Sequence, residues 1–104
     1  MTLMEFSIIP LDKGSSFSAS VARILTMVDQ SGLEYQLNPM GTVLEGEWDD
    51  LIALLSRCFR ELEKDSQRIS LTVKFDYRKG PGGRIKSKVQ SVREKAGLNL
   101  RISK

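Results

Sequence analysis

The chain contains no histidine among its 104 residues. Histidine is the commonest general base in enzymes, the usual partner of a catalytic cysteine or serine, and the commonest zinc ligand. Its absence disfavours a hydrolase triad and a zinc site. The carboxylates lie on different predicted strands and follow no metal-ligand spacing. We therefore expect no catalysis, no metal and no cofactor.

Cysteine is represented only by Cys58, which has no second cysteine for an internal disulfide. A chain without disulfides suits a reducing compartment. No basic region precedes the apolar stretch of residues 3–9 and no small-residue cleavage site follows it, so we expect no signal peptide. The apolar runs are too short to span a bilayer. These features predict a cytoplasmic protein without membrane attachment, in which Cys58 is a small core residue.

Aromatic residues are scarce where positive charge is concentrated. Residues 74–104 carry a net charge of +8 and residues 1–73 carry −5, which together give the overall +3. Recognition of single-stranded nucleic acid usually combines such charges with aromatic side chains on an exposed strand face. Phe75 and Tyr77 instead fall on the apolar side of their strand. Such a segment could attract nucleic acid or another polyanion. We favour the interpretation that it is a solvated helix face that also pairs with acidic groups of a neighbouring subunit, and nucleic acid is not the expected partner.

Two kinds of hydrophobic spacing organise the rest of the chain. Apolar and polar residues alternate over residues 3–9, 35–38, 42–47 and 69–78, which is typical of half-buried strands. Apolar residues recur every three or four positions over residues 17–31 and 48–64, which predicts two helices. Ser16 or Ser18 is a suitable N-cap for the first helix, and Gly32 a suitable stop. The Gly-Pro-Gly-Gly linker at residues 80–83 separates the last predicted strand from a basic helix, which is predicted over residues 84–96 and ends at Gly97.

The order strand, helix, strand, strand, helix, strand predicts an α+β fold. It is the ferredoxin-like βαββαβ sandwich, in which two helices cover one face of a four-stranded antiparallel sheet. The basic segment adds an extra C-terminal helix. The chain is long enough for one core. We expect a single domain over residues 1–97 and a tail over residues 98–104.

The face of the sheet away from the helices is predicted to be mixed in character. Its members are Glu5, Ser7, Ile9, Gln36, Asn38, Val43, Glu45, Ser70, Thr72, Lys74 and Asp76. An antiparallel sheet often leaves one face in water, but the apolar members also suit an interface between subunits. A ligand bound here would be a small polar or cationic heterocycle, because the face offers hydroxyls, an amide and carboxylates.

Several segments together resemble the small thiamine-binding protein family. They are EFSIIPL at residues 5–11, the serine-rich loop at residues 14–20 with the Val-Ala after it, SGLEYQLNPMGTVLEGEWDD at residues 31–50, KFDYR at residues 74–78 and KVQSVREK at residues 88–95. The combination of PMGT, LEG and WDD is the specific part. The resemblance implies non-catalytic binding of thiamine or its hydroxymethylpyrimidine moiety by a homotetramer built as a dimer of dimers, with the ligand near a subunit interface.

The resemblance also implies a set of candidate ligand-binding residues. They are Ser7, Ser16, Ser18, Asn38, Met40, Gly41, Thr42, Glu45, Lys74 and Asp76. Asn38 and Glu45 would recognise an aminopyrimidine by hydrogen bonds, and Met40 would cover the ring. Glu47 lies at the end of its strand, where contact with solvent is the simpler interpretation. The alternative function is an oligomeric interaction or regulatory module without a small-molecule ligand.

Overall fold

The computed structural model describes residues 1–86, except for the side chain of Ser16. The elements are β1 (Thr2–Pro10), the short 3-10 helix η1 (Gly14–Ser16), α1 (Phe17–Gln30), β2 (Glu34–Asn38), β3 (Gly41–Gly46), α2 (Trp48–Glu63) and β4 (Ile69–Tyr77). Each predicted strand and helix in this range is confirmed to within about two residues. Residues 84–86 are helical. The remainder of the predicted basic helix, Gly97 and the tail over residues 98–104 lie outside the described residues.

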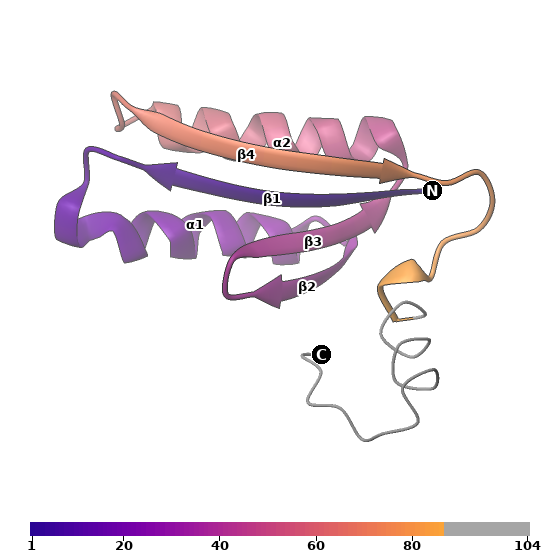
Figure 1. The fold of residues 1–104 in the computed structure, drawn as a ribbon. Coiled ribbons are helices and arrows are strands. Elements are labelled where there is room, and N and C mark those ends of the chain that lie inside the picture. Colours follow the sequence, from indigo (N-terminus) through magenta and orange to yellow (C-terminus); the bar gives the residue numbers. More distant parts are fainter. Residues whose placement is uncertain (87–104) are drawn as a thin grey trace, which may run out of the picture.

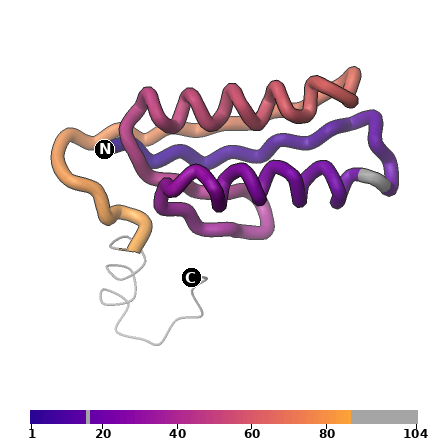
Figure 2. Tube along the Cα trace, turned by 180° about the vertical axis from the view of Figure 1, so that it is seen from behind, coloured from indigo at the N-terminus to yellow at the C-terminus, as the bar shows by residue number. Residues whose placement is uncertain are grey.

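The four strands form one antiparallel sheet in the order β2-β3-β1-β4. Both helices lie on the same face of this sheet, behind it in Figure 1 and in front of it in Figure 2. This arrangement confirms the predicted ferredoxin-like fold. Strand β1 is central and long, and it pairs with β4 over nine residues from Thr2 to Pro10.

The core lies between the sheet and the helices. It consists of Met4, Phe6, Ile8, Ile24, Val28, Leu44, Leu51, Leu54, Cys58 and Leu62. Burial of apolar surface of this kind is the main favourable term in folding. The burial of Cys58 confirms its predicted place in the core, and burial raises the pKa of its thiol to about 11.

Strand register settles which side chains share a face. Leu3 lies opposite Glu45 on β3 and Asp76 on β4, while Glu5 lies opposite Val43 and Lys74. Directly opposed residues point to the same side of a sheet. The register therefore confirms the predicted members of the helix-free face, which we call the open face, and adds Leu3 to it.

The predicted end of α1 agrees with the structure, whereas one of the two residues predicted as its N-cap does not. Gly32 has a φ of 78°, a left-handed conformation that glycine adopts without strain, and it confirms the predicted stop. The prediction of Ser18 as an N-cap is wrong, because α1 begins at Phe17 and Ser18 is already inside it. The 3-10 turn at Gly14–Ser16 brings the chain into helical geometry before Ser18 is reached.

Candidate functional site

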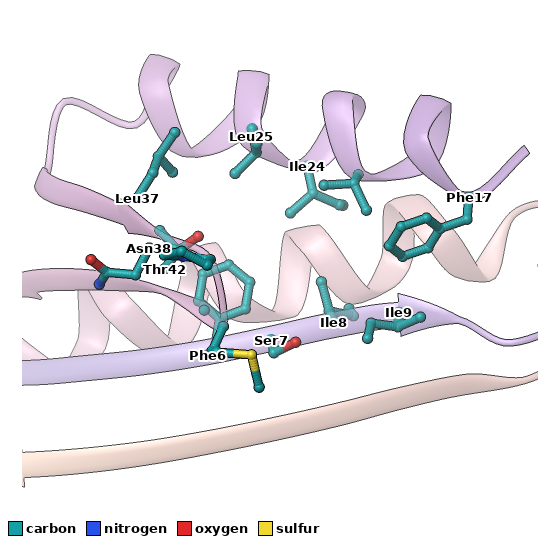
Figure 3. Close-up of a pocket in the computed structure, with 14 residues that line it drawn as sticks. Phe6, Ser7, Ile8, Ile9, Phe17, Ile24, Leu25, Leu37, Asn38 and Thr42 are labelled. Carbon is teal, nitrogen blue, oxygen red and sulfur yellow. The ribbon is translucent and has the colours of Figure 1, made fainter. Parts of the chain in front are cut away.

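A pocket of about 490 Å³ opens between α1, β1 and the turn that joins β2 to β3 (Figure 3). Its lining comprises Phe6, Ser7, Ile8, Ile9, Phe17, Val21, Ile24, Leu25, Leu37, Asn38, Pro39, Met40, Gly41 and Thr42. Mostly apolar pockets with a few polar groups are the usual sites for small ligands. This pocket is therefore the candidate site of the chain.

The pocket arises from a difference in strand length. The last pair in the register of β1 with β3 is Phe6 with Thr42, whereas β1 continues along β4 as far as Pro10. The β2–β3 hairpin therefore ends before β1 does. Beyond it, one side of β1 has no neighbouring strand among residues 1–86, and the space between this part of β1 and α1 is open as the pocket.

One face of α1 forms the apolar wall. Phe17, Val21 and Leu25 follow one another at four-residue spacing, which places them along one side of the helix. The core-facing side of the same helix carries Ile24 and Val28. Sequence analysis predicted a helix over residues 17–31 but did not connect these residues with a ligand site. The four-residue spacing was the signal that could have identified these wall residues.

The rim of the pocket carries large apolar side chains that remain in contact with solvent. Phe17 is 42% exposed, Leu37 is 47% exposed and Met40 is 89% exposed. Figure 3 shows Phe17 on α1 and Leu37 on β2 at different ends of the pocket. A bound ligand or a second protein chain that covered this rim would remove apolar surface from water.

The polar side chains of the lining are all uncharged. Ser7 and Thr42 supply hydroxyl groups, and Asn38 supplies an amide. The Gln36 Nε2 atom donates a hydrogen bond of 3.2 Å to Asn38 Oδ1, which fixes the orientation of that amide. Hydroxyl and amide groups can each donate and accept. The lining thus suits a neutral ring with polar substituents.

Half of the ten candidate residues meet at this pocket, namely Ser7, Asn38, Met40, Gly41 and Thr42. Gly41 allows a close approach where the hairpin meets β1. A Cβ atom at this position would lie 3.2 Å from the Phe6 carbonyl oxygen, and 3.4 Å from Glu5 Cγ. A side chain here would therefore push the hairpin away from β1 at the edge of the pocket.

The other candidates lie elsewhere or are not described. Ser18 is exposed on α1 and is not part of the lining. Lys74 and Asp76 are exposed on the open face of β4. The side chain of Ser16 is outside the description. As ligand contacts these residues remain predictions.

Glu45 is buried at the far end of the open face and holds the segment that follows β4. Its Oε1 accepts hydrogen bonds from the backbone N–H groups of Gly83 at 2.7 Å and Arg84 at 3.0 Å. Its Oε2 accepts a further bond of 3.1 Å from the Arg84 N–H. The side chain is 2% exposed. Its carboxylate is engaged within the chain, and a ligand role for Glu45 also remains a prediction.

Arg84 is the second buried charge of this cluster. Its Nη2 donates to the carbonyl oxygens of Asp76 at 2.7 Å and Met1 at 3.2 Å. Its Nε lies 3.8 Å from Glu45 Oε2, too far for a hydrogen bond, and has no hydrogen-bond acceptor among the described residues. The two buried charges join the start of β1, the end of β4 and the segment after it.

A polar network at the other end of the sheet holds α1 over the pocket. Asp12 accepts hydrogen bonds from the Ser66 hydroxyl and the Gln67 N–H, and these bonds lower the pKa of its carboxyl. Arg23 on α1 donates to both oxygens of Asp65 at 3.0 and 3.1 Å, which lowers the pKa of that carboxyl. These contacts tie α1 and the β1–α1 connection to the α2–β4 connection.

The chain is similar in sequence to proteins of a known family. The profile of the thiamine-binding protein family matches residues 4–93. The chain belongs to this family. A UPF0045 protein of Methanocaldococcus jannaschii is 33% identical over 90 residues, which cover 86% of this chain and 90% of that protein.

Solved structures agree with the fold. The Methanocaldococcus jannaschii protein superposes with a TM-score of 0.80 at 32% identity, over 89% of this chain and 96% of the other. A DUF77 domain from Bacillus cereus gives a TM-score of 0.77 at 29% identity, over 90% and 91% of the two chains. A Thermotoga maritima protein, for which a place in thiamine biosynthesis or salvage has been suggested, gives a TM-score of 0.74 over 86% and 97%. Its 20% identity supports the fold alone.

Two other kinds of feature are absent from residues 1–86. No helix within residues 1–86 is long and apolar enough to cross a membrane. No group of three or more cysteine and acidic side chains in the same range is arranged to hold a metal ion.

Proposed function

We propose that this protein binds thiamine or its hydroxymethylpyrimidine moiety without transforming it, and that the pyrimidine ring occupies the pocket beside α1. The observation that carries the proposal is an otherwise apolar pocket whose lining includes the polar residues Ser7, Asn38 and Thr42. Family membership supports the ligand class, since the family is described as thiamine-binding.

Each part of the pocket would serve one part of the ring. The Asn38 amide can both donate to and accept from an aminopyrimidine, and the Ser7 and Thr42 hydroxyls can adapt to the remaining polar atoms. Phe17 and Met40 would cover the faces of the ring. Gly41 leaves room where the hairpin approaches β1.

The chemistry of the chain supports the proposal of binding without catalysis. The sequence has no histidine, and its only cysteine, Cys58, is buried with its pKa raised to about 11. A thiol with such a pKa is a poor nucleophile at neutral pH. We place this function in the cytoplasm, where an unpaired cysteine is stable.

We further propose that the protein assembles as a dimer of dimers, with the ligand near a subunit interface. Strand β4 is an edge strand, and its helix-side residues Leu71 and Val73 are 38% and 36% exposed. Long exposed edges with apolar residues are normally covered in native proteins. Antiparallel pairing of two β4 strands about Val73 would place Leu71 of one copy opposite Phe75 of the other, with no like charges opposed within Ile69–Tyr77.

Calorimetric titration of the purified protein with thiamine and with hydroxymethylpyrimidine tests the binding proposal. We expect saturable binding of at least one ligand. Asn38→Ala should weaken it about three- to ten-fold, the usual range for one lost hydrogen bond. Ser56→Ala, an exposed serine on α2 outside the lining, serves as the control and should bind like the parent protein.

Absence of binding heat with either ligand at millimolar concentration would overturn the proposal. The alternative, an assembly module without a small ligand, would then be favoured if light scattering still showed an oligomer. Equal affinity of the Asn38 variant and the parent would place the ligand outside this pocket.

A further inference from the structure

The pocket can hold a neutral ring but offers no opposite charge to a positive one. Its fourteen lining residues include no aspartate or glutamate and no other charged side chain. A cation moved into such a lining would lose hydration without gaining an opposite charge. If the pocket binds the ligand proposed above, a positively charged group of that ligand must therefore lie outside it.

Glu5 is the carboxylate placed to meet such a group. It precedes Phe6 and lies two residues before Ser7 on the same side of β1, and both neighbours line the pocket. Its Cγ would be 3.4 Å from a Cβ atom on Gly41, so the side chain lies against the hairpin at the edge of the pocket. Glu5 is exposed and forms no hydrogen bond or ion pair with the described residues.

Lys74 is the charge that faces Glu5 most directly. The two residues are opposed in the register of β1 with β4, and both point to the open face. No ion pair joins them within residues 1–86, although directly opposed side chains begin only about 5 Å apart. A ligand cation beside Glu5 would be attracted by that carboxylate and repelled by the Lys74 ammonium.

We propose that Glu5 determines whether the site prefers a ligand with a cationic second ring, by contacting that ring on the open face while the neutral ring occupies the pocket. Lys74 acts in the opposite direction from the neighbouring strand. The inference rests on the proposed function and names residues that decide between its two ligands. Thiamine carries a cationic thiazolium ring, whereas hydroxymethylpyrimidine is neutral near pH 7.

Titration of Glu5→Gln and Lys74→Gln with both compounds tests this inference. We expect Glu5→Gln to weaken thiamine binding about three- to five-fold, the scale of one exposed charge pair. Lys74→Gln should strengthen thiamine binding by a similar factor. The affinity for hydroxymethylpyrimidine should change less than the affinity for thiamine in both variants. The differences should shrink as salt is raised, because salt screens exposed charges.

The outcomes separate this inference from the proposed function. If the parent protein binds neither compound, the proposed function fails. If it binds thiamine and both variants bind it with parent affinity, the role of Glu5 and Lys74 is overturned while the pocket assignment survives. Equal losses for thiamine and hydroxymethylpyrimidine in Glu5→Gln would also overturn it, because they would indicate a structural effect.

Discussion

Residues that share the open face differ in burial and in contacts, although the alternation of polar and apolar residues along the strands treats them alike. Glu5 and Glu45 both belong to this face, yet Glu5 is exposed and Glu45 is 4% exposed. The difference comes from the segment after β4, whose N–H groups at Gly83 and Arg84 reach the Glu45 carboxylate. Gly83 has a φ of 91°, a conformation that side-chain-bearing residues rarely adopt. A contact that depends on this turn cannot be read from strand alternation.

The first residue-scale prediction concerns this buried carboxylate. Glu45→Ala should lower the free energy of unfolding by about 2 to 4 kcal/mol, because it leaves the Gly83 and Arg84 N–H groups without their acceptor and removes a buried carboxylate 3.8 Å from the Arg84 guanidinium. Hydrogen exchange at the Gly83 and Arg84 amides should accelerate. Denaturant unfolding and exchange measurements check both effects. Glu47→Ala, an exposed carboxylate two residues further on, is the control. Equal stability of the two variants would contradict a structural role for Glu45.

At the scale of elements, hydrophobic periodicity predicted the fold because each strand and helix here has a clear buried side. The alternation in residues 69–78 and the spacing in residues 48–64 are produced by the same core that the structure contains. The pocket was harder to foresee. It depends on the hairpin ending at Gly41 while β1 continues to Pro10. How far β1 extends beyond the β2–β3 hairpin is set by the pairing of the strands and not by the local sequence.

The connections between elements carry a pH-dependent contribution to stability. The carboxyl pKa values of Asp12 and Asp65 are lowered in the folded protein, chiefly by hydrogen bonds from Ser66 and Arg23 respectively. A lowered folded pKa stabilises the protein above the ordinary value of 3.8, and this stabilisation is lost as the pH falls through the folded value. The protein should therefore lose stability on acidification below that value.

Substitution should make this acid dependence visible. In Asp12→Asn, thermal stability should fall less steeply with acidification than in the parent protein, because one carboxyl with a lowered pKa is gone. Glu34→Gln, which alters an exposed carboxylate on β2, is the control and should retain the parent slope. Thermal unfolding followed by circular dichroism across the acid range gives the comparison. Parallel pH profiles for the parent and Asp12→Asn would argue against this contribution.

At the scale of the whole molecule, several exposed apolar groups lie along strand edges and the pocket rim. Leu71 and Val73 lie on one edge strand, and Leu37 lies on the other, β2. Scattered apolar residues on a surface need no explanation, but a row of them beside unpaired strand backbone indicates a partner. A second copy of the chain would supply a complementary edge, since β4 paired with itself about Val73 would set Leu71 of one copy against Phe75 of the other.

A charge placed on this edge should therefore change the size of the particle. Val73→Lys should shift the protein to a smaller species, because two lysines would meet at the centre of the β4 pair, where like charges oppose association. Leu11→Lys is the matched control, since Leu11 is 50% exposed and lies in the connection after β1. Light scattering coupled to size exclusion compares the two masses with that of the parent protein. An unchanged mass for Val73→Lys would show that β4 is not the assembly edge. A loss confined to this variant would make β4 the edge on which assembly depends.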